Sequence, residues 1–130
     1  MYLLDTNAVI NYLDAALPAP AMQFLSTVID ENCNISVITK METLGYAFKS
    51  IGEQKTIETF VSGSTVFAIN DEIVNKTIAI RKTKKIKLPD AIIAATALVY
   101  GFILISRNTA DFNNIQYLHV IDPYSRLAHL

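Results

Sequence analysis

The side chains best suited to chemistry are four carboxylates in separate segments of the chain. They are Asp5, Glu42, Asp90 and Asp111. Carboxylates gathered in one cleft repel each other, and two unit charges about 4 Å apart cost about 4 kcal/mol at an effective dielectric of about 20. Mg²⁺ and Mn²⁺ relieve this repulsion, because hard divalent cations prefer carboxylate oxygens and water as ligands. If the four acids converge, we therefore expect a Mg²⁺ or Mn²⁺ site.

Asp5 and Glu42 each have an ordinary structural explanation when they are taken singly. Asp5 or Asn7 can cap a helix that starts near Ala8, because short polar side chains accept hydrogen bonds from the first free amides of a helix. Glu42 follows Thr39 at the spacing of a capping box, which marks a helix start. Neither acid alone indicates a site.

The same is true of Asp90 and Asp111. Asp90 stands at a predicted helix start, where the positive end of the helix dipole favours an ionised carboxylate whatever its role. Asp111 follows Asn108, which can cap a short helix. The case for chemistry therefore depends on the elements that position the four acids together.

Short apolar runs alternate with longer helical patterns along the chain. We predict strands over residues 2–4, 34–38, 65–69, 102–105 and, more weakly, 118–121. We predict helices over residues 8–13, 21–29, 39–51 (ended by Gly52), 53–61, from Asn70 into the basic run that follows, and 90–100. This alternation indicates one domain over residues 1–130, with a three-layer α/β/α fold and a central, mostly parallel sheet of four to five strands.

The predicted topology brings three of the four acids to one edge of the sheet. In parallel sheets covered by helices, functional groups lie beyond the carboxyl ends of the strands. Asp5, Glu42 and Asp111 each follow a predicted strand, so we expect them to share that edge. No strand precedes Asp90, and its placement rests on the resemblance described next.

Four segments contain these acids together with their neighbours. They are Leu3-Leu4-Asp5-Thr6-Asn7, Ile35-Ser36-Val37-Ile38-Thr39-Lys40-Met41-Glu42, Leu88-Pro89-Asp90-Ala91 and Ile105-Ser106-Arg107-Asn108-Thr109-Ala110-Asp111-Phe112. These segments resemble PIN domains, and their order and the chain length are most similar to the VapC-type toxins of bacterial toxin–antitoxin pairs. The resemblance spans almost the whole chain and implies that the family acids fall on Asp5, Glu42, Asp90 and Asp111. The supporting polar positions fall on Thr6, Asn7, Thr39 and Asn108.

The resemblance implies a metal-dependent endoribonuclease that hydrolyses RNA phosphodiester bonds and leaves a 5′-phosphate and a 3′-hydroxyl. It implies Asp5, Asp90 and Asp111 as the principal ligands of Mg²⁺ or Mn²⁺. Glu42 would bind a second ion or orient the attacking water. Thr6, Asn7 and Asn108 would hold carboxylates and solvent in place around the ion.

The resemblance also implies two protein partners. VapC-type toxins form homodimers, and a cognate antitoxin silences them by wrapping a C-terminal segment around the toxin and delivering a basic side chain to the acidic pocket. An apolar groove formed by the helices between residues 39 and 61 is a candidate site for binding that segment. Tyr46 and Phe48 are its candidate contacts, although packing in the core is the alternative for both.

Five basic residues crowd between positions 81 and 87, although the formal net charge of the chain is −1. One interpretation is a solvated helix end, because cations stabilise the negative end of the helix dipole. The other is a strip of RNA phosphate contacts made by Lys84, Lys85 and Lys87. The net charge argues against a general nucleic-acid binder, but the local distribution of charge sets the field. Composition leaves both interpretations open.

Composition excludes several other classes of protein. The chain is 52% apolar and 18% charged, which is typical of a globular protein. One cysteine, Cys33, allows neither an internal disulfide framework nor a multi-cysteine zinc site, and neither His119 nor His129 lies in the four segments. The apolar stretch over residues 91–105 is shorter than the roughly 20 residues of a membrane helix, and no secretory leader is evident. We therefore expect a cytoplasmic protein that does not enter the membrane.

Three competing functions fit the sequence less well than the nuclease does. A phosphatase of the haloacid dehalogenase type needs a second Asp two residues after the first, where this chain has Asn7. A response-regulator receiver needs an acidic pair at the first strand, which is absent. A non-catalytic PIN-fold binding module is the alternative from another class. The complete set of four acids argues against it.

Overall fold

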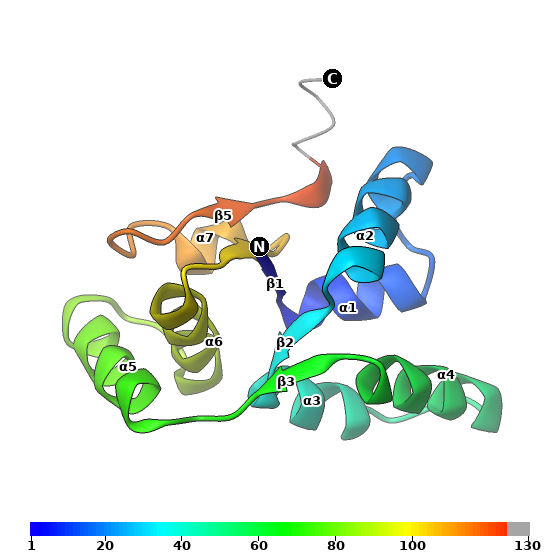
Figure 1. Ribbon diagram of the computed structural model, residues 1–130, viewed down its shortest axis with the longest axis horizontal. Coiled ribbons are helices and arrows are strands. Elements are labelled where there is room, and N and C mark those ends of the chain that lie inside the picture. Colours follow the sequence, from blue (N-terminus) through cyan, green and yellow to red (C-terminus); the bar gives the residue numbers. More distant parts are fainter. Residues whose placement is uncertain (125–130) are drawn as a thin grey trace.

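The chain folds around a five-stranded parallel sheet (Figure 1). The computed structural model describes residues 1–124. The strands are β1 (Tyr2–Leu4), β2 (Asn34–Ser36), β3 (Thr65–Phe67), β4 (Ile103–Ile105) and β5 (Val120–Ile121). They lie in the order β3-β2-β1-β4-β5, and all four neighbouring pairs are parallel. The predicted parallel sheet is confirmed, and its central strands are β1, β2 and β4.

Helices cover both faces of this sheet (Figure 1). They are α1 (Thr6–Leu13), α2 (Ala19–Glu31), α3 (Val37–Leu44), α4 (Ile51–Ser62), α5 (Asp71–Thr83), α6 (Leu88–Tyr100) and α7 (Thr109–Phe112). Successive strand residues point to opposite faces, so Leu3 packs with α5, α6 and α7 while Leu4 packs with α1, α2 and α4. The two resulting cores make the predicted α/β/α sandwich.

The start of α3 differs from the prediction. The expected strand over residues 34–38 ends at Ser36, and the expected helix start at Thr39 lies inside α3. The hydroxyl oxygen of Ser36 accepts a hydrogen bond from the amide of Ile38 at 3.1 Å. This cap turns the chain into a helix two residues early and overrides the strand preference of the β-branched Val37 and Ile38.

The predicted helix over residues 39–51 is two helices. α3 ends before Gly45, where a Cβ atom would lie 2.8 Å from the carbonyl oxygen of Met41, so a larger residue does not fit. α4 begins after Ser50, whose hydroxyl accepts a hydrogen bond from the amide three residues later. Gly52, the expected helix end, therefore lies in the first turn of α4. The close backbone approach at Gly45 and the cap by Ser50 therefore divide the predicted helix into two.

The α5–α6 hairpin follows the prediction closely. Asn70 caps α5 by accepting a hydrogen bond from the amide of Ile73 at 2.9 Å. Pro89 lies in the first turn of α6, and Gly101 ends that helix with a φ of 69°, a left-handed conformation that favours glycine. The largely buried α6 thereby holds its first turn, with Asp90, at the carboxyl edge of the sheet.

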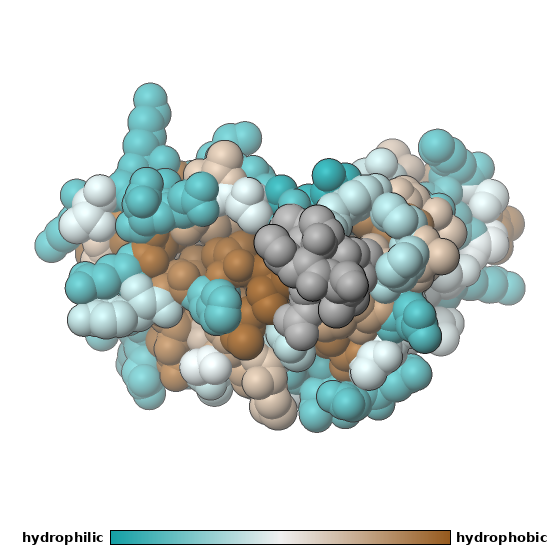
Figure 2. Space-filling model, turned by 90° about the horizontal axis from the view of Figure 1, so that it is seen from above, coloured by the Kyte–Doolittle hydropathy of each residue, from teal (hydrophilic) through white to brown (hydrophobic). Residues whose placement is uncertain are grey.

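The surface seen from above combines polar and apolar areas (Figure 2). Polar side chains surround an apolar area on the side of the molecule that carries α5, α6 and α7. Within residues 1–124, none of the helices combines the length and apolar character needed to cross a membrane. His129, which the sequence assigns no role, lies outside the described residues.

Candidate active site

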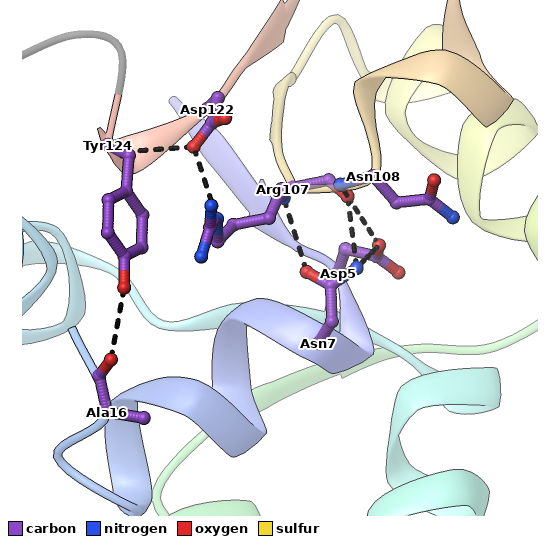
Figure 3. Close-up of polar contacts among 8 residues, drawn as sticks. Asp5, Asn7, Ala16, Arg107, Asn108, Asp122 and Tyr124 are labelled. Carbon is purple, nitrogen blue, oxygen red and sulfur yellow. Dashed lines mark hydrogen bonds and ion pairs between the residues drawn. The ribbon is translucent and has the colours of Figure 1, made fainter.

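Asp5 lies at the centre of a buried hydrogen-bond network at the end of β1 (Figure 3). One carboxylate oxygen accepts the amide of Thr6 at 2.8 Å, so Asp5 does cap α1. The other oxygen accepts the hydroxyl of Ser106 at 2.7 Å and the side-chain amide of Asn7 at 3.1 Å. Asp5 is 4% exposed. The cap therefore accounts for only one of its two oxygens.

The environment of Asp5 opposes its ionisation. Burial raises the pKa of this carboxyl from 3.8 to about 6, and the charges of Asp90 and Glu42 act in the same direction. The hydrogen bonds from Ser106 and Thr6 lower the pKa but do not offset the loss of water. A carboxylate held this way gains stability from a nearby cation.

Glu42 reaches across from α3 to α1. Its Oε1 accepts the hydroxyl of Thr6 at 2.6 Å. The hydroxyl of Thr39, which is fully buried, lies 3.0 Å from the same Thr6 oxygen and completes the chain of contacts. The alternative in which Glu42 serves as the capping-box partner of Thr39 is wrong, because α3 begins at Val37 and Ser36 is its cap.

Asp111 is held by the loop after β4. The side-chain amide of Asn108 donates to Asp111 Oδ2 at 2.6 Å, and the Asn108 backbone amide donates to the Ser106 hydroxyl at 3.0 Å. Asn108 occupies the N-cap position of α7, but its side chain makes no capping hydrogen bond. The side chain of Asn108 is therefore used to hold Asp111.

Asp90 joins the other acids from the first turn of α6. Its pKa is raised, first by burial and then by the charges of Asp111 and Glu42, while the charge of Lys87 lowers it. Asp5 in turn experiences the charges of Asp90 and Glu42. The structure thus places all four predicted acids within electrostatic reach of one another, including the one that no strand precedes.

The donor chemistry of these acids fits a hard divalent cation. The four side chains offer only carboxylate oxygens, which Mg²⁺ and Mn²⁺ prefer. Burial, and after it repulsion by the neighbouring acids, raises the pKa of Asp5 and of Asp90. Among residues 1–124, however, no three His, Cys, Asp or Glu side chains are gathered closely enough to form a ready-made metal cluster. The four acids influence one another electrostatically without forming a closed cage.

The sequence patterns assigned no role to Ser106 and Arg107, and the structure ties Ser106 to Asp5 and Arg107 to Asn7. Ser106 is fully buried against Asp5, and the backbone amide of Arg107 donates to the side-chain oxygen of Asn7 at 3.3 Å. The signal was present, because Ser106 follows β4 just as Asp5 follows β1. In the sheet Leu4 pairs with Ile105, which sets these two polar residues side by side.

The three lysines predicted to contact RNA do not all line the same hollow. Lys85 and Lys87 line a hollow together with Asp111. Lys84 does not line that hollow and contributes to two others instead. Two of the three lysines therefore share a hollow with one of the acids, Asp111.

The two predicted antitoxin contacts, Tyr46 and Phe48, differ in their exposure. Tyr46 is 48% exposed and lines a hollow of about 220 Å³ between α1 and α4, with Ile10 and Leu13 on its walls. Phe48 is half-buried and packs against the core beneath α1, α2 and α4. The aromatic side chain open to a partner is Tyr46.

Comparison with known proteins matches residues 2–116 to the PIN domain. A toxin–antitoxin complex from Klebsiella pneumoniae contains a similar chain, with 35% identity, a TM-score of 0.77, and coverage of 95% of this chain and 98% of the other. DNA-bound VapBC from Salmonella typhimurium gives 25% identity and a TM-score of 0.78, covering 94% and 97%. VapBC-1 from nontypeable Haemophilus influenzae gives 27% identity and a TM-score of 0.76, covering 95% and 98%. A search of curated proteins found no match.

Proposed function

The chain belongs to the PIN domain family, and on that premise we propose that it is a metal-dependent endoribonuclease that acts as the toxin of a toxin–antitoxin pair. The observation that carries this proposal is the mutual electrostatic influence of four carboxylates at one edge of the sheet. Burial and these charges raise the pKa of Asp5 and of Asp90. Raised pKa values of clustered acids are typical of a functional site, and carboxylate oxygens are the ligands that a hard divalent cation prefers.

Asp5, Asp90 and Asp111 are the residues that would hold Mg²⁺ or Mn²⁺, with Glu42 beside them. When bound, the ion supplies positive charge to the scissile phosphate and lowers the pKa of a bound water. Glu42, whose Oε1 accepts the hydroxyl of Thr6 at 2.6 Å, would orient that water. RNA phosphodiester hydrolysis is the reaction that this division of roles supports.

The polar neighbours keep the carboxylates in place before any ion binds. Ser106 and Asn7 fix one oxygen of Asp5, and Asn108 fixes one oxygen of Asp111. Thr39 and Thr6 together set the position of Glu42. Because such partners fix the orientation of metal ligands, they commonly affect metal affinity nearly as strongly as the ligands do.

We further propose a cognate antitoxin as the protein partner. The similar structures named above are toxin–antitoxin complexes, one of them bound to DNA. The hollow at Tyr46 between α1 and α4 is a candidate place for an apolar side chain of the antitoxin. The homodimer and the single domain over residues 1–130 stay predictions.

The alternative function is a non-catalytic PIN-fold binding module. It differs from the nuclease in one measurable way, since it predicts binding of RNA or protein without turnover. Purified free of antitoxin, the nuclease should cut RNA with Mg²⁺ or Mn²⁺, and EDTA or Asp5→Asn should abolish cutting. Cutting that survives both treatments, or no cutting with either ion, would refute the proposed function.

A further inference from the structure

A hollow of about 440 Å³ lies beside the acids, and its walls are mainly basic. It is lined by Arg81, Lys85, Ile86, Lys87 and Asp111. These residues come from the last turn of α5, the connection to α6, and α7. Three cations and one of the four acids therefore face the same space.

The cations of this hollow form no ion pair with a carboxylate within residues 1–124. Within residues 1–124 the recorded salt bridge joins Arg107 to Asp122, so Arg81, Lys85 and Lys87 have no carboxylate partner within 4.0 Å in that part of the chain. Asp111 lines the same hollow without pairing to them. Unpaired positive charge on the wall of a hollow attracts an anion.

Arg81 is also fixed in place. Its Nε donates to the carbonyl oxygen of Ile86 at 3.3 Å, which anchors the side chain against the connection between α5 and α6. That bond uses one of the five N–H donors of a guanidinium, a group whose planar geometry suits the oxygens of a phosphate. The charge of Lys87 reaches the acids, since it lowers the pKa of Asp90. The basic wall and the acidic region are thus adjacent parts of one surface.

We propose that this hollow is a phosphate subsite, in which Arg81 and Lys85 bind the RNA backbone at a linkage next to the one that is cut. This inference rests on the proposed function, because it requires an RNA strand lying across the four acids. The acids attract the metal ion, and the basic wall binds a neighbouring phosphate. The two halves of the surface therefore bind groups of opposite charge. Arg81, to which the sequence patterns assigned no RNA contact, thereby joins Lys85 at this subsite.

The strand has a continuous path beyond this subsite. A larger hollow of about 760 Å³ shares Arg81, Lys85 and Ile86 with the first and extends along α5, without Asp111 on its walls. Arg81 and Lys85 therefore stand between the acids and the larger hollow. A backbone leaving the acids on this side has to pass both cations.

Binding of a fluorescently labelled single-stranded oligoribonucleotide, measured by anisotropy in EDTA, tests the subsite without any cleavage. Arg81→Ala and Lys85→Ala should each weaken binding about five- to tenfold and make it less dependent on salt, because each loses one phosphate contact. Arg81→Lys retains the charge and should recover most of the affinity. Lys55→Ala, an exposed lysine on α4 that lines neither hollow, should change binding by less than about twofold.

A neutral methylphosphonate placed at one linkage at a time locates the contact. At the linkage held by Arg81, the neutral group and Arg81→Ala should together weaken binding no more than either alone. At every other linkage their effects should multiply, since independent contacts add in free energy. Multiplication at all linkages, equal effects of Arg81→Ala and Lys55→Ala, or no binding by the parent at low salt would overturn the subsite.

The same variants separate failure of the subsite from failure of the proposed function. If the parent cuts RNA and Arg81→Ala binds and cuts normally, the subsite is wrong and the nuclease stands. If the charge-dependent binding is as described but neither Mg²⁺ nor Mn²⁺ supports cutting, the subsite stands and the nuclease is wrong.

Discussion

The guanidinium of Arg107 lies 3.5 Å from the centre of the Tyr124 ring, and this contact joins the segment after β5 to the loop that holds the acids (Figure 3). Arg107 Nε also lies 3.8 Å from Asp122 Oδ1. The hydroxyl of Tyr124 donates to the carbonyl oxygen of Ala16 at 3.1 Å, beyond the end of α1. Through its backbone amide, Arg107 contacts Asn7. The pair therefore ties the loop after β4 to α1.

Removing the Tyr124 ring should loosen that loop and reduce turnover. Arg107 stands between Ser106, which holds Asp5, and Asn108, which holds Asp111. Tyr124→Leu should lower stability by about 1–2 kcal/mol through the lost cation–π contact and hydrogen bond. It should also lower kcat severalfold with little change in KM, as measured by steady-state RNA cleavage and thermal melting.

Tyr124→Phe is the matched control for this prediction. It keeps the ring over Arg107 and loses only the hydrogen bond to Ala16, so kcat should stay within about twofold of the parent while stability falls by about 1 kcal/mol. A Tyr124→Leu variant that melts earlier but retains the full kcat would show that the contact serves stability alone.

The raised pKa of Asp5 predicts how stability depends on pH. Because its pKa is about 6 in the folded protein and 3.8 in the unfolded chain, the folded state binds the proton more tightly. The stabilisation is fully present below about pH 4 and is lost as pH rises through 6, amounting to about 3 kcal/mol for the Asp5 carboxyl. Urea unfolding in EDTA at several pH values measures this loss.

Asp5→Asn isolates the contribution of that carboxyl. Between pH 4 and pH 7 the unfolding free energy of the parent should fall relative to that of Asp5→Asn, because only the parent can ionise at this position. Carboxyls that do not interact with Asp5 contribute equally to both proteins and cancel. If the unfolding free energy of the parent stays constant or rises relative to that of Asp5→Asn across this range, the buried environment assigned to Asp5 is contradicted.

Neutralising Asp90 should not cost stability in the metal-free protein. Its carboxylate is opposed by burial and by the charges of Asp111 and Glu42, so Asp90→Asn should melt at or above the temperature of the parent in EDTA. Asp71→Asn, at the exposed start of α5, provides the contrast, because it loses about 0.3–1 kcal/mol of helix-dipole stabilisation and relieves no such cluster. A large drop in melting temperature for Asp90→Asn would make Asp90 a structural helix cap first.

Ser106 is expected to control metal affinity without binding the ion. Its hydroxyl donates to Asp5 Oδ2 at 2.7 Å, so Ser106→Ala leaves that oxygen less well held. Affinity for Mn²⁺ should fall about tenfold or more, as for other residues that orient metal ligands. Ser26→Ala, which removes a serine paired with Tyr12 instead, should leave Mn²⁺ affinity unchanged. Equal affinities for the two variants would contradict the role of Ser106.

The parts of the fold that the sequence predicted well are those with one dominant local signal. β1 and the buried α6 are recognised from their apolar runs, and Gly101 ends α6 as expected. The region from Asn34 to Ser62 was predicted less well, because two serine caps there compete with β-branched and helical patterns. Single hydroxyl hydrogen bonds decide those boundaries, and a periodicity argument does not detect them.

The candidate site shows a similar division. Strand ends placed Asp5 and Asp111 correctly at one edge, whereas Asp90 needed the family resemblance because a helix positions it. The partnership of Ser106 with Asp5 depends on the register of β1 against β4, and the hollow shared by Arg81 with Asp111 depends on how α5 packs. Both are relations between distant segments, which local patterns do not specify.

Direct titration of the antitoxin-free protein with Mn²⁺, followed by electron paramagnetic resonance, tests most directly whether the four acids act as one site. Asp5→Asn, Glu42→Gln, Asp90→Asn and Asp111→Asn should each weaken binding by about tenfold or more, because each removes charge from the same region. Glu58→Gln on α4 should bind as the parent does. If any three of these four single variants bind Mn²⁺ as tightly as the parent, a shared metal site is contradicted.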